Sequence, residues 1–195
     1  MGKAIAVLGH YGSGKTEFSV NYAMHLKRSG VKTALLDLDI ANPYFRSRER
    51  QKMLEEMGIS IYFNGFDIAE DLPAITAKIR TPLEDETCTT VADIGGNDSG
   101  ARIMNQFRKY FLAKETERYL VVNANRFETD TLEGALFHLR SIEEETGLSI
   151  TGIVNNTHML TETTTDDILK GYELCQKLSR STGIPIVFST CAKHL

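Results

Sequence analysis

The sequence has few cysteines and no excess of basic residues, and each shortage argues against a class of protein. Its three cysteines, Cys88, Cys175 and Cys191, are widely spaced. They suit neither a disulfide framework nor the ligand spacing of a zinc site, so we expect a reducing, cytoplasmic setting. The formal net charge is −4, whereas general nucleic-acid and membrane-surface binders carry a basic excess. We therefore predict no nucleic-acid partner.

Long apolar runs are also missing. No stretch approaches the ~20 residues that span a bilayer, so no transmembrane segment is predicted. The first apolar run, Ala4–Leu8, is too short for a signal peptide. Repeats, linkers and low-complexity tracts are not apparent either. The 195 residues suit one α/β nucleotide-binding domain, residues 1–195, and its short end after the last apolar run is consistent with a missing C-terminal helix.

Short apolar runs alternate with longer amphipathic ones along the chain. The short runs lack strict alternation, which is typical of strands buried in a parallel sheet. The pattern predicts a three-layer, doubly wound α/β fold with a mostly parallel sheet of about seven strands and P-loop NTPase topology. We expect strands at Ala4–Leu8, Thr33–Leu38, Ile59–Phe63, Thr89–Ile94, Tyr119–Ala124, Ile150–Val154 and Ile184–Phe188. We expect helices at Phe18–Lys27, Arg46–Met57, Ala74–Ile79, Ala101–Leu112, Leu132–Glu145 and Asp166–Ser181, four of them followed by the stop residues Gly30, Gly58, Gly147 and Gly183.

Residues 9–16 match the phosphate-binding pattern G-x-x-x-x-G-K-[ST] between a predicted strand and a predicted helix. Glycines let backbone N–H groups turn inward around phosphates, and the helix N-terminus adds partial positive charge. We expect Lys15 to reach the β- and γ-phosphates and the Thr16 hydroxyl to ligate Mg²⁺. A dinucleotide fingerprint fails because Glu17 stands where glycine or alanine is needed. The predicted nucleotide contacts here are Gly9, Gly12, Ser13, Gly14, Lys15, Thr16 and Glu17.

Aspartates end two of the predicted strands. Asp93 and Gly96 form Asp-x-x-Gly, in which the carboxylate can hold a Mg²⁺-bound water and the glycine N–H can sense the γ-phosphate. A plain strand-terminal turn is the alternative. Asp37 and Asp39 end the second strand, and they point to opposite faces unless the strand ends at Asp37. We expect different roles for them, one near the metal and one near a water or partner, with a strand end plus a helix cap as the alternative.

The loop after Asp39 carries two aromatic residues and two arginines, Tyr44, Phe45, Arg46 and Arg48. Such a loop suits a switch or docking segment, and it equally suits a hydrophobic staple before a helix.

Two asparagines, Asn155 and Asn156, end the sixth predicted strand. Side-chain amides can read the adenine edge through a donor and an acceptor, and a plain turn is the alternative. Asn-Lys-x-Asp, the usual guanine-reading pattern of GTPases, does not occur in the sequence.

Taken together, these motifs resemble the MinD/ParA class of SIMIBI P-loop NTPases, the CobQ/CobB/MinD/ParA group. That class includes the nitrogenase iron protein, arsenite-pump ATPases and dethiobiotin synthetase. The resemblance covers nearly the whole chain and implies ATP or ADP and Mg²⁺ as cofactors. By position it implies that Lys15 and Thr16 bind phosphate and Mg²⁺, Asp37 lies in the outer metal shell, Asp39 orients the attacking water, Asp93 takes the Walker B role and Asn156 contacts adenine.

One position departs from the class. Members that form ATP sandwich dimers carry a second lysine just after the first glycine of the loop, where this sequence has His10. That lysine neutralises transition-state charge across the dimer, so we expect slow hydrolysis unless another cation substitutes. Arg46 and Arg48 are the candidates from sequence, acting in cis or across a homodimer.

The predicted function is a Mg-dependent ATPase that acts as a nucleotide switch on an unidentified protein partner. The alternatives stay open. One is a small-molecule enzyme that activates a carboxylate, as in dethiobiotin synthetase and the cobyrinate amidases, which also lack the extra lysine. A small-molecule kinase and a metallochaperone GTPase are the others. Such a kinase would need an arginine-rich lid. A metallochaperone GTPase would need Asn-Lys-x-Asp and a Cys/His metal motif. None of these occurs in the sequence.

Overall fold

The structure is a computed structural model, and it describes residues 3–39, 50–63, 72–95, 106–112, 115–192 and 195. Its centre is a seven-stranded sheet in which the strands follow the order β3-β2-β4-β1-β5-β6-β7. Every pairing between these neighbours is parallel, as the unbroken apolar runs predict. The strands are β1 (Ala4–Leu8), β2 (Thr33–Asp37), β3 (Ser60–Phe63), β4 (Thr89–Asp93), β5 (Glu117–Val122), β6 (Gly152–Asn155) and β7 (Ile186–Ser189).

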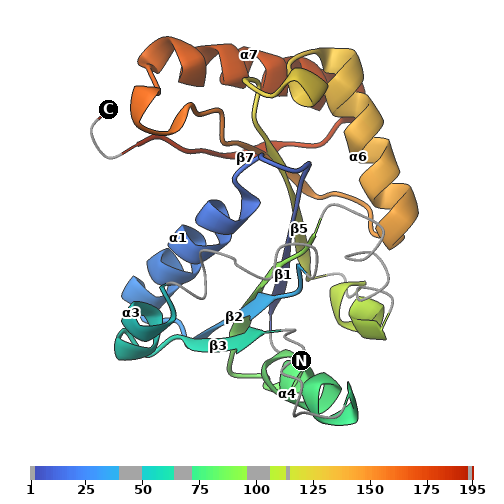
Figure 1. Cartoon of the computed structure of the whole chain (residues 1–195). Helices are drawn as coiled ribbons and strands as arrows, with labels where there is room; N and C mark the ends of the chain where they lie inside the picture. Colours follow the sequence, from blue (N-terminus) through green and yellow to red (C-terminus); the bar gives the residue numbers. More distant parts are fainter. Residues whose placement is uncertain (1–2, 40–49, 64–71, 96–105, 113–114, 193–194) are drawn as a thin grey trace.

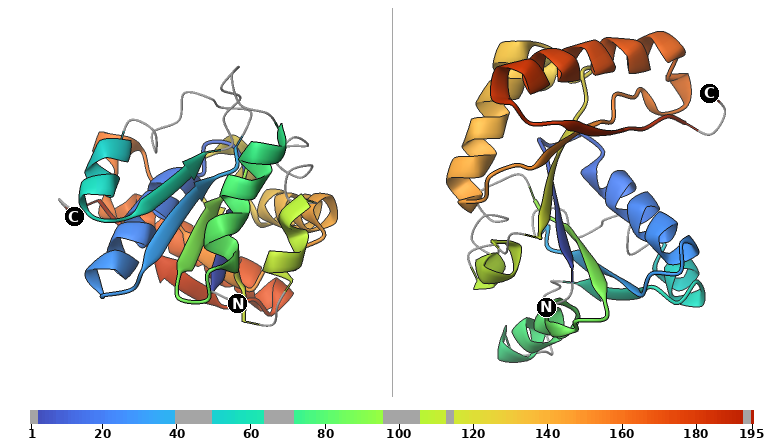
Figure 2. Two further views of the ribbon diagram at one scale, coloured as in Figure 1. Left: turned by 90° about the horizontal axis from the view of Figure 1, so that it is seen from below. Right: turned by 180° about the vertical axis from the view of Figure 1, so that it is seen from behind.

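Helices cover both faces of the sheet, which confirms the predicted three-layer α/β fold (Figure 1, Figure 2). On one face lie α1 and α3, and on the other lie α4, α6, α7 and the helical residues 106–111. Within the described part of the chain, no helix is both long and apolar enough to cross a bilayer. The helices are α1 (Lys15–Arg28), α3 (Gln51–Glu56), α4 (Leu72–Glu84), α6 (Leu132–Thr146) and α7 (Thr165–Thr182), with short 3₁₀ turns at Phe127–Thr129 and Leu160–Glu162.

The central strand β1 contributes to a hydrophobic core on each face of the sheet. Ile5 and Val7 pack with Phe18 of α1 on one side. Ala6 and Leu8 belong to the core on the other side. Because successive side chains of a strand point to opposite faces, both sets are buried and the strand reads as a continuous apolar run.

The helix predicted at Ala74–Ile79 is too short, since α4 runs over Leu72–Glu84 and includes Pro82. Proline lacks a backbone N–H and normally ends a helix, which is why the sequence favours an earlier stop. Leu83 is nonetheless packed into the core. Its burial offsets the lost hydrogen bond and extends the helix.

The bounds of every strand except β1 differ from the prediction by one or two residues, and β5 and β6 show the reason. β5 begins at Glu117, two residues early, because its ladder with β1 pairs Ile5 with Glu117. The backbone amide of Thr151 donates to the carbonyl of Arg118 (2.8 Å), while β6 itself starts only at Gly152. The residues at which these strands begin therefore depend on pairing with a neighbouring strand, and not on apolar content.

The four glycines predicted to end helices all adopt the left-handed conformation. Gly30, Gly58, Gly147 and Gly183 have φ of 84°, 76°, 62° and 75°. This conformation lets a chain leave a helix at little steric cost only when glycine occupies the position. The predicted helix stops are confirmed.

Candidate functional site

The phosphate loop joins β1 to α1 and leads directly into the helix. α1 begins at Lys15, three residues before the predicted start. Gly14 precedes it with φ of 81°, and a Cβ there would collide with the Asn156 amide, so only glycine fits. The first helical hydrogen bond runs from the Phe18 N–H to the Gly14 carbonyl (3.0 Å). The N–H groups before Phe18 thus stay outside the helical ladder, as an anion-binding helix end requires.

Two buried aspartates end neighbouring strands beside this loop. Asp37 of β2 and Asp93 of β4 lie directly opposite each other in the sheet register. Val7, the partner of Asp93 on β1, packs on the α1 face. In-register residues of parallel strands share a face, so both carboxylates point toward α1. There the Thr16 hydroxyl donates to Asp93 Oδ2.

Asp39 completes the acidic cluster because β2 ends at Asp37. The alternation of faces stops with the strand, and the Asp39 N–H donates to Asp37 Oδ1 (3.2 Å). The Asp39 carboxylate lies 3.7 Å from Lys15 Nζ, with 8% and 7% of the two side chains exposed. The loop lysine is therefore held against a carboxylate in a buried position.

The pKa of Asp93 is raised to about 7, mainly by burial and also by the neighbouring carboxylates of Asp37 and Asp39, against the lowering effect of Lys15 and the Thr16 hydroxyl. Asp93 Oδ1 is buried and has no hydrogen-bond partner among the described residues. An unpartnered carboxylate oxygen beside a hydroxyl is a donor set that suits a hard cation such as Mg²⁺. Among the described residues no three His, Cys, Asp or Glu side chains converge on a metal position. A Mg²⁺ ion here would also need phosphate oxygens and waters as ligands, as is usual for this ion.

Asp93→Asn is expected to raise the melting temperature of the nucleotide-free protein at about pH 8, by at least about 2 °C. The pKa of Asp93 is about 7 in the folded protein against 3.8 for the free group. Between these two pKa values the folded state binds more protons than the unfolded state. The free energy of unfolding therefore falls as the pH rises from about 4 to about 7, and it stays low above that range. The melting-temperature difference between variant and wild type should shrink at about pH 5.

Thermal melts at both pH values provide the check, with Asp85→Asn as the matched control. Hydrogen bonds from Lys32 and Thr87 lower the pKa of the partly exposed Asp85 to about 2, so its loss should bring no gain at either pH. An Asp93→Asn gain that is the same at both pH values would contradict the raised pKa.

His10, the residue in place of the second lysine, lies against α6. Its ring and that of His138 have centroids 4.1 Å apart at an interplanar angle of 48°. His10 Nδ1 is buried and has no hydrogen-bond partner among the described residues. Burial, together with the adjacent His10, lowers the pKa of His138. The ring at position 10 is thus part of the packing between the loop and α6.

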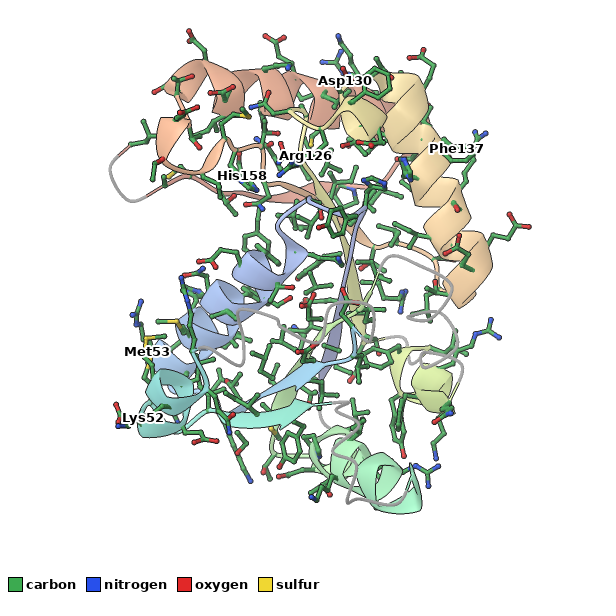
Figure 3. The ribbon with its side chains drawn as sticks, in the orientation of Figure 1. Lys52, Met53, Arg126, Asp130, Phe137 and His158 are labelled. Carbon is green, nitrogen blue, oxygen red and sulfur yellow. The ribbon has the colours of Figure 1, made fainter. Side chains whose placement is uncertain are left out.

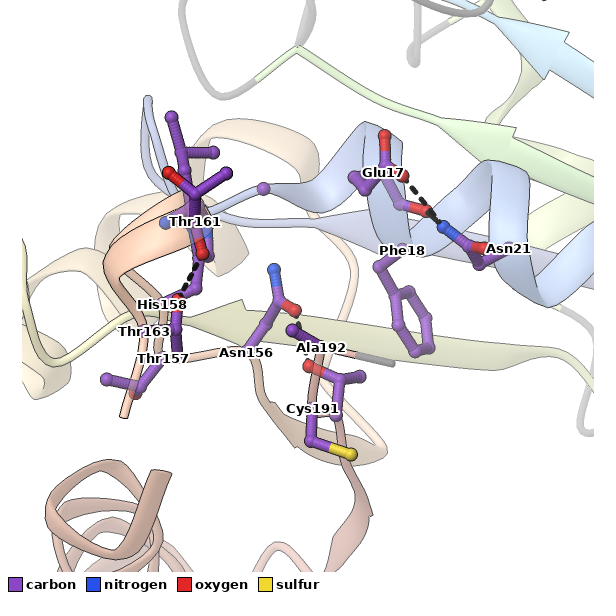
Figure 4. Close-up of a pocket in the computed structure, with 13 residues that line it drawn as sticks. Glu17, Phe18, Asn21, Asn156, Thr157, His158, Thr161, Thr163, Cys191 and Ala192 are labelled. Carbon is purple, nitrogen blue, oxygen red and sulfur yellow. Dashed lines mark hydrogen bonds between the residues drawn. The ribbon is translucent and has the colours of Figure 1, made fainter. Parts of the chain in front are cut away.

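A cleft of about 750 Å³ opens beside the phosphate loop, between α1 and the segments that follow β6 and β7. Figure 4 shows Phe18 and Asn21 of α1 on one side of Asn156, with His158 and Thr161 on the other. The Asn156 amide donates to the Ser13 carbonyl (2.8 Å) and accepts from the Thr190 hydroxyl. The cleft is lined by Gly14, Glu17, Phe18, Asn21, Asn156, Thr157, His158, Leu160, Thr161, Thr163, Thr190, Cys191 and Ala192.

The two asparagines that sequence reasoning grouped together have separate positions. Asn155 is the last residue of β6, is fully buried, and donates to Ile168 O and Ser189 Oγ. Of the pair, only Asn156 lines the cleft.

The structure also brings in residues that sequence reasoning missed. Thr190 contacts Asn156 from 34 positions away, and Arg126 reaches the Gly12 carbonyl across 114 positions. Neither belongs to a motif, so no local signal marks them. The predicted contributions of Gly96, Tyr44, Phe45, Arg46 and Arg48 lie outside the described residues.

Comparisons with known proteins support the fold. No family model and no curated protein matches the chain. Cell division protein FtsY of Thermotoga maritima aligns with 22% identity and a TM-score of 0.62, over 95% of this chain and 60% of that one. The signal recognition particle receptor FtsY of Elizabethkingia anophelis aligns with 18% identity and a TM-score of 0.63, over 99% and 60% of the two chains. The chain thus spans about 60% of the length of these FtsY proteins.

A third solved structure is more similar in length. It is the nucleotide-binding protein of Archaeoglobus fulgidus in complex with ADP, with 20% identity and a TM-score of 0.58 over 99% of this chain and 83% of that one. At such identities the likeness concerns the fold. The fold is an α/β P-loop NTPase-like fold that matches these neighbours.

Proposed function

We propose that the chain binds Mg-ATP and hydrolyses it, and that it acts as a nucleotide switch of the MinD/ParA-like kind on a protein partner. The observation that carries this proposal is the cluster of Lys15, Thr16 and three buried aspartates around the phosphate loop. Each buried carboxylate is costly to desolvate, and groups of buried ionisable residues are typical of functional sites.

Each residue of the cluster has a role in this proposal. Lys15 binds the β- and γ-phosphates, with Gly9, Gly12, Ser13, Gly14 and Glu17 contributing loop and helix N–H groups. Thr16 and Asp93 would hold Mg²⁺, and Asp37 would serve its outer shell. When bound, the ion would supply charge neutralisation at the phosphates. Asp39 would orient the attacking water.

The support for a switch comes from the resemblance to the MinD/ParA class. The sequence after Asp39, whose carboxylate lies 3.7 Å from Lys15 Nζ, carries the aromatic residues Tyr44 and Phe45. These two residues lie outside the described part of the chain, so their docking role stays a prediction from the sequence.

The base that the cleft takes is the finer question, because one solved FtsY neighbour is in complex with GDP and another neighbour is in complex with ADP. The Asn156 side chain donates one amide hydrogen to the Ser13 carbonyl and accepts one hydrogen bond from the Thr190 hydroxyl. One donor and one acceptor remain, which match N7 and the N6 amino group of adenine. Glu17 is the one carboxylate among the described cleft residues. Arg50 and Asn21 occupy its Oε1, while its Oε2 is buried and has no hydrogen-bond partner among the described residues. The preference for adenine over guanine therefore rests on the Asn156 amide and on the missing Asn-Lys-x-Asp.

The chain is expected to bind ADP at least about tenfold more tightly than GDP, the discrimination that one bidentate base contact provides. Side-by-side calorimetric titrations in Mg²⁺ measure both affinities. Asn156→Asp, which keeps the acceptor and loses the donor, should reduce the preference for ADP. Thr161→Val, which lines the same cleft without contacting the Asn156 amide, serves as the control and should keep it. Equal or tighter GDP binding by wild type would overturn the adenine assignment and favour a GTPase.

A further inference from the structure

Arg126 stands in a rigid turn at the carboxyl end of β5, next to β1. The Asn125 N–H donates to Asn123 Oδ1 (3.0 Å) and the Arg126 N–H to the Asn123 carbonyl (3.2 Å). The Thr129 N–H then donates to the Arg126 carbonyl (2.9 Å), and Asn123 itself is fully buried. The backbone that carries the Arg126 side chain is thus held from both sides.

The guanidinium lies directly on the phosphate loop. Arg126 Nε donates to the Gly12 carbonyl at 3.0 Å, and Figure 3 shows Arg126 at the end of the sheet where this loop lies. Gly12 has φ of 75°, and a Cβ added to it would stand 2.9 Å from Arg126 Nε and 3.2 Å from Cζ. A glycine at this position is what allows the guanidinium so close to the loop backbone.

The positive charge of Arg126 is not neutralised within the described residues. The guanidinium has five N–H donors, and Gly12 takes one of them. The ion pairs among the described residues involve Lys3, Lys15, Lys32 and Arg50, and not Arg126. The site's carboxylates lie toward Lys15 and Thr16. Arg126 therefore brings a cation without an ion-pair partner among the described residues to a loop whose own cation, Lys15, is paired with Asp39.

We propose that Arg126 is a second phosphate-binding cation, supplied by the same chain, which contacts the phosphates of the bound nucleotide from the β5 side of the loop. The inference rests on the nucleotide binding proposed above. Guanidinium groups bind phosphate oxygens through paired N–H donors, and the fixed turn presents this one in advance. With His10 packed against His138, Arg126 supplies in cis some of the charge that a lysine at position 10 would bring.

The test compares Arg126→Gln, Arg126→Lys and wild type in calorimetric titrations with ADP and ATP in Mg²⁺ at low and high salt. Arg126→Gln should bind both nucleotides about tenfold more weakly, the lower end for a charge-assisted contact at an exposed site. Its affinity should also depend less on salt, because one phosphate contact is lost. Arg126→Lys keeps the charge and should recover part of the affinity.

Arg108→Gln is the matched control, since Arg108 also donates to a glycine carbonyl, that of Gly147 at 2.9 Å, at the far end of α6. It should bind like wild type. Unchanged affinity in Arg126→Gln would overturn the inference. An equal loss in the Gln and Lys variants with an unchanged salt dependence would also overturn it, because the arginine would then act only by shaping the loop. If wild type binds neither nucleotide, the proposed function fails, and this inference fails with it.

Discussion

Lys15→Ala is expected to weaken Mg-ATP binding roughly tenfold to hundredfold, because it removes a charge-assisted contact to phosphate of about 1.5–3 kcal/mol. Lys15 is buried in the first turn of α1, where the loop leads into the helix. Its Nζ lies 3.7 Å from the Asp39 carboxylate. Calorimetric titration of the variant with ATP measures the change, and near-UV circular dichroism checks that the fold is retained.

The matched control for this substitution is Lys32→Ala. Lys32 also pairs with an aspartate, Asp85 at 2.8 Å, but it is 63% exposed and precedes β2 at the opposite end of the sheet. Removing an exposed pair costs little, so this variant should bind ATP like wild type. ATP affinity that is unchanged in Lys15→Ala would contradict the assignment of the loop.

Asp39→Asn is expected to slow ATP hydrolysis by about 10²–10⁴ while ATP still binds, because a group that orients the attacking water is lost. The carboxylate is 8% exposed and lies 3.7 Å from the Nζ of Lys15, the lysine proposed to bind the γ-phosphate. Removal of a negative charge beside the phosphates should leave binding equal or tighter. Single-turnover phosphate release, alongside ATP affinity, separates the two effects.

Asp85→Asn, the same substitution at a partly exposed aspartate away from the loop, controls for a general loss of activity. Hydrolysis by Asp39→Asn at the wild-type rate would move the role elsewhere, and Asp37 would be the next candidate. Phosphate release by pure wild type without a second substrate also discriminates the ATPase from the carboxylate-activating alternative, which requires an acceptor.

The sheet was predictable because its strands are buried on both faces. β1 has the predicted bounds, Ala4–Leu8, since every residue in it enters one of the two cores. The phosphate loop and Asp93 were predictable for a related reason, because a motif and a strand end are both local features. The orientation of Asp39 depended on where β2 stops, and the sequence left both outcomes open.

The rest of the site depends on contacts between segments that are distant in sequence. Arg126 reaches Gly12 because β5 pairs with β1, and that strand order is not encoded near either residue. The contact between His10 and His138 depends likewise on where α6 packs against the sheet. Arg46 and Arg48 were favoured from sequence because they follow Asp39 closely along the chain. They lie outside the described residues, so their role stays a prediction.

The central claim is that the loop around Lys15 and the aspartates next to it form a Mg-nucleotide site. Titration of the wild-type chain with ATP, with and without Mg²⁺, tests it most directly. The account predicts saturable binding of one ATP per chain that is tighter with Mg²⁺, because Thr16 and Asp93, which lie in contact, would hold the ion against the phosphates. Binding of no nucleotide, or binding to which Mg²⁺ makes no difference, would contradict it.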